Sequence, residues 1–381
     1  MADRFIETTR TSYGSRVKSS LAGVIFGLLF IVGAFFLLWR NEGRAVRTAN
    51  GLAEGAKLVL SVGRENVHPE NEGKLIHISG PVTVTRPLTD SLFGITQEAL
   101  SLTRKVEMYQ WKEKSKTTRR ETAGGGTEAE TTYTYERTWA DEPVSSASFK
   151  RPEGHTNPAE WRFKSQTWLA EDARLAAFHI PTRLVARMGD PLLIPMEPGK
   201  FSHQETPAPK VYQEKLYFGT DPASPQVGDQ RLTFTRVMPG EYSFVAKQAG
   251  STISPYTTRA GTELDMLEKG LVDAKAMFRR AVAQNTALTW ALRVAGWFLM
   301  FIGINLFFRP LATLGRIIPF LGGLLDTGVT IFSAVLASIV SLVTIGLAWL
   351  AYHPALAITL LVLAAIIFLA AGMKYKKTAI G

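Results

Sequence analysis

The sequence predicts an α-helical membrane protein with four transmembrane helices and a large β-rich α+β extramembrane domain inserted between the first and second of them. Three observations predict this class. Apolar residues form one block near the N-terminus and three near the C-terminus, the long segment between them is polar, and the excess positive charge lies beside the apolar blocks. The net charge is +10, but residues 41 to 288 hold 32 basic and 30 acidic residues. The charge therefore indicates membrane orientation rather than nucleic-acid binding.

The first apolar block covers residues 21 to 39 and contains no charged residue. A transmembrane helix needs about 20 apolar residues to cross about 30 Å of hydrocarbon. A cleaved secretory signal is the alternative, but this block is longer than the usual apolar core of a signal, and no small-residue cleavage site follows it. We therefore predict an uncleaved span, preceded by a cytoplasmic tail at residues 1 to 20.

The polar segment from residue 40 to 261 is predicted to form an extracytoplasmic domain rich in strands. Runs of Val, Ile, Thr, Tyr and Phe bounded by Gly, Pro, Asn or Asp are typical of strands. Such runs cover residues 57–62, 74–78, 82–86, 105–111, 131–139, 211–218, 231–237 and 241–247. Residues 114 to 130 contain a triple glycine and are predicted to be a mobile hairpin tip. A phosphate-binding loop is disfavoured there because its residue spacing is missing.

From residue 262 to 288 apolar residues recur at spacings of three and four, which predicts an amphipathic juxtamembrane helix. Its apolar face consists of Leu264, Leu267, Leu271, Phe278 and Val282. Packing against the extramembrane domain is the first interpretation of this face. Contact with the membrane surface or with another subunit is the alternative.

The last part of the chain contains the three other apolar blocks. They cover residues 289 to 308, 329 to 351 and 354 to 371, and a basic cytoplasmic tail follows at 372 to 381. Arg309 and Pro310 are expected to end the second span, because proline has no backbone N–H for the helix. Residues 309 to 328 are then a cytoplasmic or interfacial connection. Only Tyr352 and His353 separate the last two spans, which predicts a tight helical hairpin.

The flanking Lys and Arg residues predict the orientation of these spans. If the N-terminus is cytoplasmic, the short basic segments all fall on the cytoplasmic side, and the link between the third and fourth spans carries no Lys or Arg. We therefore predict that both termini are cytoplasmic and that the large domain is periplasmic or luminal. Arg293, near the start of the second span, is expected to reach the lipid headgroups.

Small residues at four-residue spacing predict close helix packing on two spans. They are Ser19, Gly23 and Gly27 on the first span, and Ser333, Ala337 and Ser341 on the third. Packing within one bundle is the simpler interpretation, and an oligomer interface or the lining of a polar pore is the alternative. Asn305 is expected to make an interhelical hydrogen bond. Asp326 and His353 are expected at the membrane–water interface.

Enzyme motifs are missing from the sequence. The chain has no cysteine, its six histidines form no metal-binding motif, and no nucleophile elbow occurs. We therefore predict a protein that is not an enzyme and that uses no cofactor or metal. Its predicted partners are membrane lipid, further copies of the same chain and other membrane proteins, but not nucleic acid.

Five short strings, in this order along the chain, resemble the transmembrane protein 43 (LUMA) family. They are VEMYQW at 106–111, GHTNP at 154–158, VGD at 227–229, VAKQ at 245–248 and AWLAYHP at 348–354. The resemblance covers nearly the whole chain and implies four spans with a large luminal domain. It also implies, for eukaryotic members, the inner nuclear membrane and endoplasmic reticulum, with lamins and emerin as associates. Bacterial members have no lamins, and His353 stands where the resemblance leads us to expect an arginine.

These features together predict an integral membrane scaffold or sensor that self-associates through its spans and organises partner proteins through its large domain. Two alternatives stay open. One is an oligomeric cation-conducting channel, a role that has been suggested for the family, and the other is an extracytoplasmic hydrolase. The predicted location is the inner (cell) membrane for a bacterial source, and the endoplasmic reticulum or inner nuclear membrane for a eukaryotic one.

Overall fold

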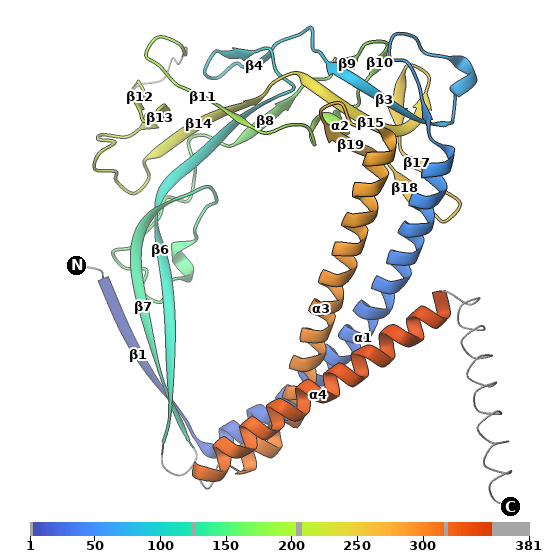
Figure 1. Ribbon diagram of the computed structural model, residues 1–381. Coiled ribbons are helices and arrows are strands. Elements are labelled where there is room, and N and C mark those ends of the chain that lie inside the picture. The colour runs from blue at the N-terminus through green and yellow to red at the C-terminus, as the bar shows by residue number, and fades with distance from the viewer. Residues whose placement is uncertain (1–2, 123–125, 203–207, 316–318, 353–381) are drawn as a thin grey trace, which may run out of the picture.

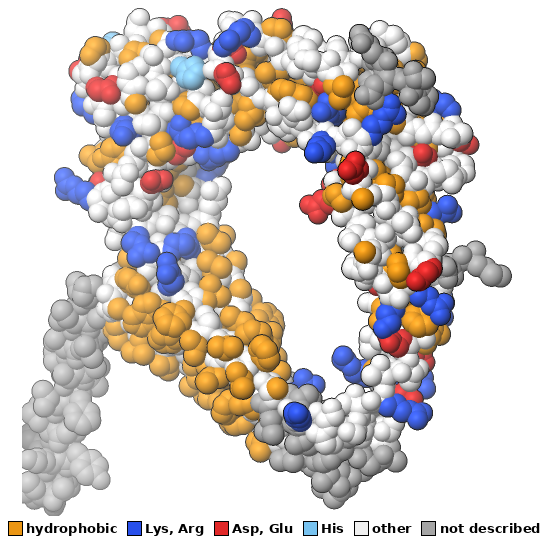
Figure 2. Space-filling model, turned by 180° about the vertical axis from the view of Figure 1, so that it is seen from behind, with side chains coloured by type: hydrophobic (Ala, Val, Ile, Leu, Met, Phe, Trp, Pro, Cys, Tyr) orange, Lys and Arg blue, Asp and Glu red, His pale blue; other side chains and the backbone are white. Residues whose placement is uncertain are grey.

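The structure is a computed structural model that describes residues 3–122, 126–202, 208–315 and 319–352. Three long helices lie on one side, a strand-rich domain covers their upper end, and a long β-arm descends on the other side (Figure 1). The arm returns to the lower end of the helices, so the molecule surrounds an opening that Figure 2 shows in space-filling form.

Three helices of the described chain are long and apolar enough to cross a membrane. They are α1 (Tyr13–Leu58), α3 (Ala274–Gly315) and α4 (Pro319–Tyr352). The blocks predicted at 21–39, 289–308 and 329–351 lie within them. The predicted fourth span, 354–371, lies outside the described residues together with His353 and the basic tail.

Two of the helices continue well beyond their apolar blocks into the strand-rich domain. Residues 40–58 of α1 and 274–288 of α3 form this extension, which we call the stalk. The upper part of the stalk packs into one apolar cluster with the domain, formed by Leu52, Leu75, Val245, Leu264, Met277 and Phe278. The domain is therefore attached to the spans by two continuous helices rather than by a flexible linker.

The sheet nearest the stalk has seven strands in the order β2-β3-β15-β16-β10-β9, with β19 paired to β15. Their bounds are β2 Leu60–Ser61, β3 Leu75–Val82, β9 Arg174–Leu175, β10 Phe178–His179, β15 Gly240–Ala249, β16 Thr252–Ser254 and β19 Met266–Lys269. Alternate residues of β3 and β15 bury Ile76, Ile78 and Phe244 in the largest core of the domain. The helix α2 (Thr182–Val185) closes this core with Leu184 and Val185.

The second sheet has eight strands in the order β1-β7-β6-β14-β13-β12, with β11 on β14 and β8 on β6. Their bounds are β1 Asp3–Thr11, β6 Ser101–Glu121, β7 Thr127–Ala140, β8 Gln166–Leu169, β11 Leu192–Ile194, β12 Lys210–Tyr212, β13 Lys215–Phe218 and β14 Gln230–Val237. An aromatic core of Phe93, Phe163, Phe218 and Phe234 packs against it. Two small ribbons complete the domain, β4 (Leu88–Asp90) with β5 (Ile95–Gln97) and β17 (Tyr256–Thr257) with β18 (Glu263–Leu264).

A three-stranded arm extends from the second sheet. It consists of β1, residues 111–121 of β6 and residues 127–137 of β7. The expected hairpin is present, but its tip is shorter than the predicted 114–130, because β6 and β7 stay paired from Met108 opposite Ala140 to Glu121 opposite Thr127. The many threonines favour extended pairing, and the hydroxyls of Thr117 and Thr131 lie 2.9 Å apart across the strands.

Residues 3–20, within the predicted cytoplasmic tail, contain a strand and the start of a helix. Strand β1 pairs antiparallel with β7, from Asp3 opposite Tyr135 to Thr11 opposite Thr127, and α1 starts two residues later at Tyr13. The alternation of β1 is weak in the sequence, so only the long-range pairing shows that it is a strand.

The predicted juxtamembrane helix at 262–288 is correct only in its second half. Residues 263–264 and 266–269 are strands, and α3 begins at Ala274. The pairing of Met266 with Val245 on β15 overrides the apparent helical period, because Leu264 and Leu267 can then enter the domain core. Phe278 is buried on α3, whereas Leu271 and Val282 are exposed.

Three further boundaries differ from those expected. Helix α1 extends to Leu58 and leaves only β2 of the strand predicted at 57–62, and of the run 82–86 only Val82 belongs to a strand. Pro310 does not end the second span, because α3 continues through it to Gly315. The connection predicted at 309–328 is correspondingly shorter, since α4 begins at Pro319.

Candidate functional site

A polar cluster lies where α1 leaves its apolar block. Here Asn41 donates to the carbonyl oxygen of Thr289 at 3.1 Å. Arg44 donates to Asn285 Oδ1 at 2.8 Å and to Thr289 Oγ1 at 2.9 Å. These bonds join α1 to α3 at the level where the spans pass into the stalk.

The centre of the cluster is a buried ion pair between Glu42 and Arg293. Nε and Nη2 of Arg293 each lie 2.8 Å from one carboxylate oxygen, which is a bidentate arrangement, and Glu42 is only 1% exposed. The guanidinium also lies 4.9 Å from the ring centroid of Trp290. Arg293 therefore binds Glu42, a partner that the sequence did not predict, and removal of either partner would leave a costly buried charge.

The third helix closes on the same cluster. A Cβ atom placed on Gly43 would lie 2.5 Å from the ring of Tyr352, so only glycine admits this contact with the end of α4. Trp39 lies beside the same ring, at a centroid distance of 6.3 Å. We call this three-helix cluster the polar clamp; it consists of Asn41, Glu42, Gly43, Arg44, Asn285, Thr289, Arg293 and Tyr352.

Below the polar clamp the predicted packing residues occupy different environments. A Cβ on Gly27 would lie 2.7 Å from the carbonyl oxygen of Gly303, so α1 and α3 are in backbone contact there, whereas Gly23 has no neighbour within 4 Å among the described residues. Ser333, Ala337 and Ser341 are all buried against the other helices.

Few contacts are described for the remaining candidate residues on the spans. Asn305 is half-buried and has no hydrogen-bond partner among the residues that the structure describes. The side chains of Ser19 and Asp326 are not described, and His353 lies beyond the described chain. An interhelical hydrogen bond that was not expected joins Trp297 Nε1 to Ser338 Oγ at 3.0 Å.

The base of the arm is braced by the loop that carries GHTNP. Asn157 accepts a hydrogen bond from the backbone N–H of Trp111 at 2.7 Å and donates to its carbonyl at 2.9 Å. His155 stacks on Tyr135 at a centroid distance of 3.9 Å and meets the edge of Trp111 at 4.8 Å. The family strings at 106–111 and 154–158 thus meet at one place, which we call the arm root.

Further bonds join the three strands of the arm to the same loop. Tyr135 donates to Glu113 at 2.8 Å, and burial, followed by this carboxylate, raises the pKa of Tyr135 to about 12. Lys150 pairs with Glu7 of β1 at 2.8 Å. This hydrogen bond lowers the pKa of Glu7 and raises the pKa of Lys150.

The arm and the helices both connect the start of α1 with the strand-rich domain. The tip of the arm lies at Thr11, next to the start of α1, and the base of the arm joins the domain into which the end of α1 runs. Any plane that separates the two ends of α1 therefore also cuts β6 and β7. Figure 2 shows an apolar belt on the spans, whereas the arm carries seven acidic and eight basic residues.

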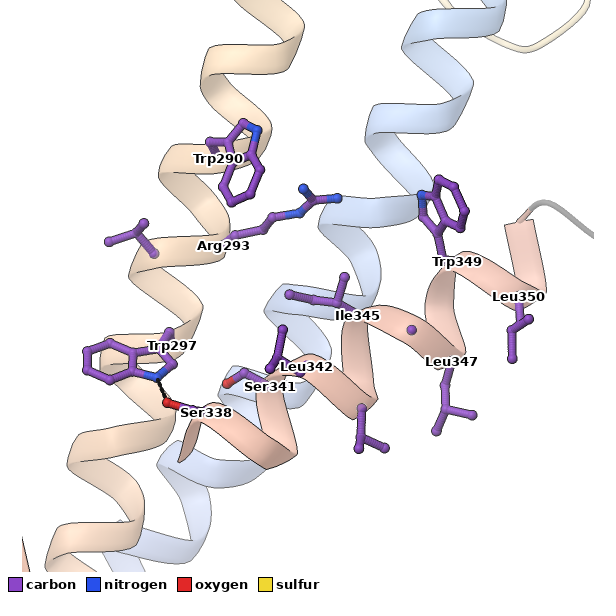
Figure 3. A pocket seen from close by; sticks show the side chains of 13 residues that line it. Trp290, Arg293, Trp297, Ser338, Ser341, Leu342, Ile345, Leu347, Trp349 and Leu350 are labelled. Atoms are coloured by element: carbon purple, nitrogen blue, oxygen red, sulfur yellow. Dashed lines mark hydrogen bonds between the residues drawn. The ribbon is translucent and has the colours of Figure 1, made fainter. Parts of the chain in front are cut away.

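An apolar groove of about 890 Å³ lies between α3 and α4, just below the polar clamp. Figure 3 shows Trp290 and Trp297 on one wall and Leu342, Ile345 and Trp349 on the other. Within residues 3–122, 126–202, 208–315 and 319–352, no group of three or more His, Asp or Glu side chains could hold a metal ion.

Comparisons with known proteins agree with the resemblance in the sequence. A family model described as Transmembrane protein 43 matches residues 108–354. Transmembrane protein 43 of Rattus norvegicus is 34% identical over 89% of this chain and 86% of its own length, and that of Homo sapiens is 32% identical over 91% and 88%. The Transmembrane protein 43 homolog of Drosophila melanogaster is 30% identical over 92% and 94%. No solved structure matches.

Proposed function

The chain belongs to the transmembrane protein 43 family and is a multi-pass membrane protein, and from this premise we propose that it acts as a non-enzymatic, self-associating scaffold or sensor. The large domain is the part that meets partner proteins outside the cytoplasm. The spans hold that domain at a fixed distance from the bilayer and bind further copies of the chain.

The stalk supports the sensor part of this proposal. Helices α1 and α3 run without a break from the apolar blocks into the domain core, and the polar clamp joins them to α4 between the two. A tilt of the spans is therefore carried to the domain as a rigid displacement, because no loop lies between them to absorb it.

The arm is the single observation that carries self-association. With the termini in the cytoplasm and the domain outside it, β6 and β7 must pass the whole depth of the apolar belt. Residues 111–121 of β6 give about 36 Å of strand, which is enough for about 30 Å of hydrocarbon. Charged strands with an open edge are not stable in lipid, which supports our proposal that further copies of the chain shield the arm from it.

The same arm keeps the channel alternative open. Arms gathered at the centre of an oligomer would line a water-filled path with threonines and charged residues. The balance of seven acidic and eight basic residues gives such a path little preference for cations. Conductance of the purified protein in planar bilayers tests this alternative, and silent bilayers with inserted protein would reject it.

Cross-linking in native membranes tests self-association directly, because the chain has no cysteine of its own. We expect Thr118→Cys, an exposed position on the arm, to form covalent dimers or larger species with a bifunctional thiol reagent. Ser91→Cys, exposed on the domain, is the matched control and should cross-link far less. A strictly monomeric Thr118→Cys protein would contradict the proposal.

A further inference from the structure

A cavity of about 220 Å³ lies on the second sheet and shares no residue with the polar clamp or the arm root. Tyr217 of β13 and Arg231 of β14 lie opposite each other in register, and both line the cavity. Their neighbours Leu216 and Leu232 enter the aromatic core, so the cavity lies on the other face of the sheet. Its volume equals that of about seven water molecules in the liquid, which suits one small group rather than a large cofactor.

Three aromatic rings line this cavity, those of Trp139, Tyr212 and Tyr217. The rings of Trp139 and Tyr217 meet edge to face, at a centroid distance of 6.2 Å. The hydroxyl of Tyr217 already hydrogen-bonds to Asp229, so the ring of this residue, rather than its hydroxyl, is left for a ligand. The rings therefore offer an apolar surface against which a flat or apolar body can pack.

The charges at the cavity are positive. Among the described residues that line it, only Lys215 and Arg231 are charged. Arg231 Nε donates to Glu107 at 2.7 Å, and the guanidinium lies 4.4 Å from the ring centroid of Trp139. Lys215 is half-buried, and its ammonium has no ion-pair or hydrogen-bond partner in the part of the chain that the structure describes. A partly buried charge without a partner is costly, which favours an anion in the cavity.

The turn beside the cavity is strained. Gln213 and Glu214 connect β12 to β13 and have φ angles of 49° and 61°. Asn and Gly are favoured in two-residue hairpin turns of this kind, because most other residues rarely adopt the left-handed conformation. Gln213 itself lines the cavity. Strained backbone is concentrated at ligand sites, so the turn supports a ligand here independently of the charges.

We propose that this cavity binds a carboxylate carried on an aromatic or other apolar body. The two oxygens of a carboxylate match the planar fork of guanidinium donors, and the Nη atoms of Arg231 have no described partner. Lys215 supplies the second positive charge, and the three rings pack against the body of the ligand. A free small acid and the C-terminus of a partner protein present this same chemistry. The site lies outside the spans, so it stands whether or not the chain self-associates.

Phenylacetate and its neutral analogue phenylacetamide test the chemistry of the ligand. We expect ligand-observed NMR, with the full-length protein in lipid nanodiscs and empty nanodiscs as the blank, to show binding of phenylacetate. Phenylacetamide should bind at least tenfold more weakly, because hydrogen bonds to charged groups are the stronger ones. N-acetylphenylalanine presents its carboxylate as a protein C-terminus does. Tighter binding of this probe than of phenylacetate would assign a protein C-terminus, and the reverse order would assign a free acid.

Variants of Lys215 test the place of binding. Lys215→Gln should weaken the binding of the preferred acid at least tenfold, whereas Lys215→Arg should retain it. Lys247→Gln is the matched control, because Lys247 is a half-buried lysine on β15 that does not line the cavity. No binding of either acid, equal binding of phenylacetamide, a preference for inorganic phosphate, or unchanged binding to Lys215→Gln would each overturn the proposal. The Thr118→Cys cross-link tests self-association separately from all of these results.

Discussion

Two routes connect the domain with the start of α1. The helical route consists of α1 and α3, the other route is the three-stranded arm, and the two have surfaces suited to different solvents. The helical route has exposed apolar side chains and buried polar ones, with glycines where the helices touch. The arm has exposed charges and hydroxyls, and its few buried side chains lie at its root. At the same height, the molecule therefore has an apolar surface on its helices, which suits lipid, and a polar surface on its arm, which suits water.

The two routes also differ in what stabilises them. The spans depend on one buried ion pair and on backbone contact at Gly27, where a single substitution affects two helices. The arm depends on backbone pairing along its strands and on exposed ion pairs that are each worth little. Substitutions should therefore have large effects on the helical route and graded effects on the arm.

The largest effect is expected at the polar clamp. Glu42→Ala leaves the guanidinium of Arg293 largely buried without its partner, which should cost about 3 kcal/mol of stability. The thermal unfolding midpoint in lipid nanodiscs measures the loss. The double variant Glu42→Leu/Arg293→Met should recover most of it, because apolar replacement of a buried pair is often neutral. A double variant as unstable as Glu42→Ala would show that the pair is not coupled.

The next effect is expected at the contact between α1 and α3. Gly27→Leu would place a side chain against the backbone of Gly303 and Phe307, and the overpacking should cost about 1–3 kcal/mol. Gly23→Leu is the control one turn away, where the added atoms meet open space. Equal unfolding midpoints for the two variants would contradict the helix contact.

The arm root should give a similar loss that stays local. Asn157→Ala removes three hydrogen bonds to the backbone of Trp111 and Val144, at a cost of about 1–3 kcal/mol. Hydrogen exchange should become faster in β6 and β7 but not in the spans. Thr156→Ala, at the exposed neighbouring position, should leave exchange unchanged. Faster exchange throughout the molecule would show that the two routes are not independent.

The smallest effect is expected from pH acting on β1. The lowered pKa of Glu7 means that its contribution is complete above its ordinary value of 4.5 and is lost as the pH falls. The raised pKa of Lys150 means that its contribution is complete below 10.5 and is lost as the pH rises further. Hydrogen-exchange protection of β1, corrected for intrinsic rates, should therefore fall on the acid side. Glu7→Gln should remove that acid dependence.

Composition and alternation within a short stretch of sequence predicted some of the helices and strands. The three apolar helices and five long strands of the domain (β3, β6, β7, β14 and β15) follow from composition and alternation, because burial of their side chains requires those patterns. The pattern predicts a helix at 263–269 because Leu264 and Leu267 have the three-residue spacing of a helix face, whereas in the structure they lie on two strands and enter different core clusters. The stalk was missed in α1, since a polar helix held only by tertiary contacts resembles any polar segment.

The candidate sites were harder to predict than the fold. Glu42 and Arg293 are 251 residues apart, and nothing near either one signals the other. The arm root joins the strings at 106–111 and 154–158, which the family resemblance had selected. The resemblance did not indicate that the two strings are in contact. The pairing of β1 with β7 has no local signal, because it depends on strands more than 100 residues apart.

That pairing imposes an order on biosynthesis. Residues 3–11 leave the ribosome before α1, whereas their partners at 127–135 follow roughly 6 to 25 s later at ordinary elongation rates. The N-terminus must therefore wait, unpaired, while α1 is inserted and the hairpin is made. The pairing of β1 with β7 is therefore a late step. A chain stalled before residue 127 would expose an unpaired strand to any protein that binds extended peptides.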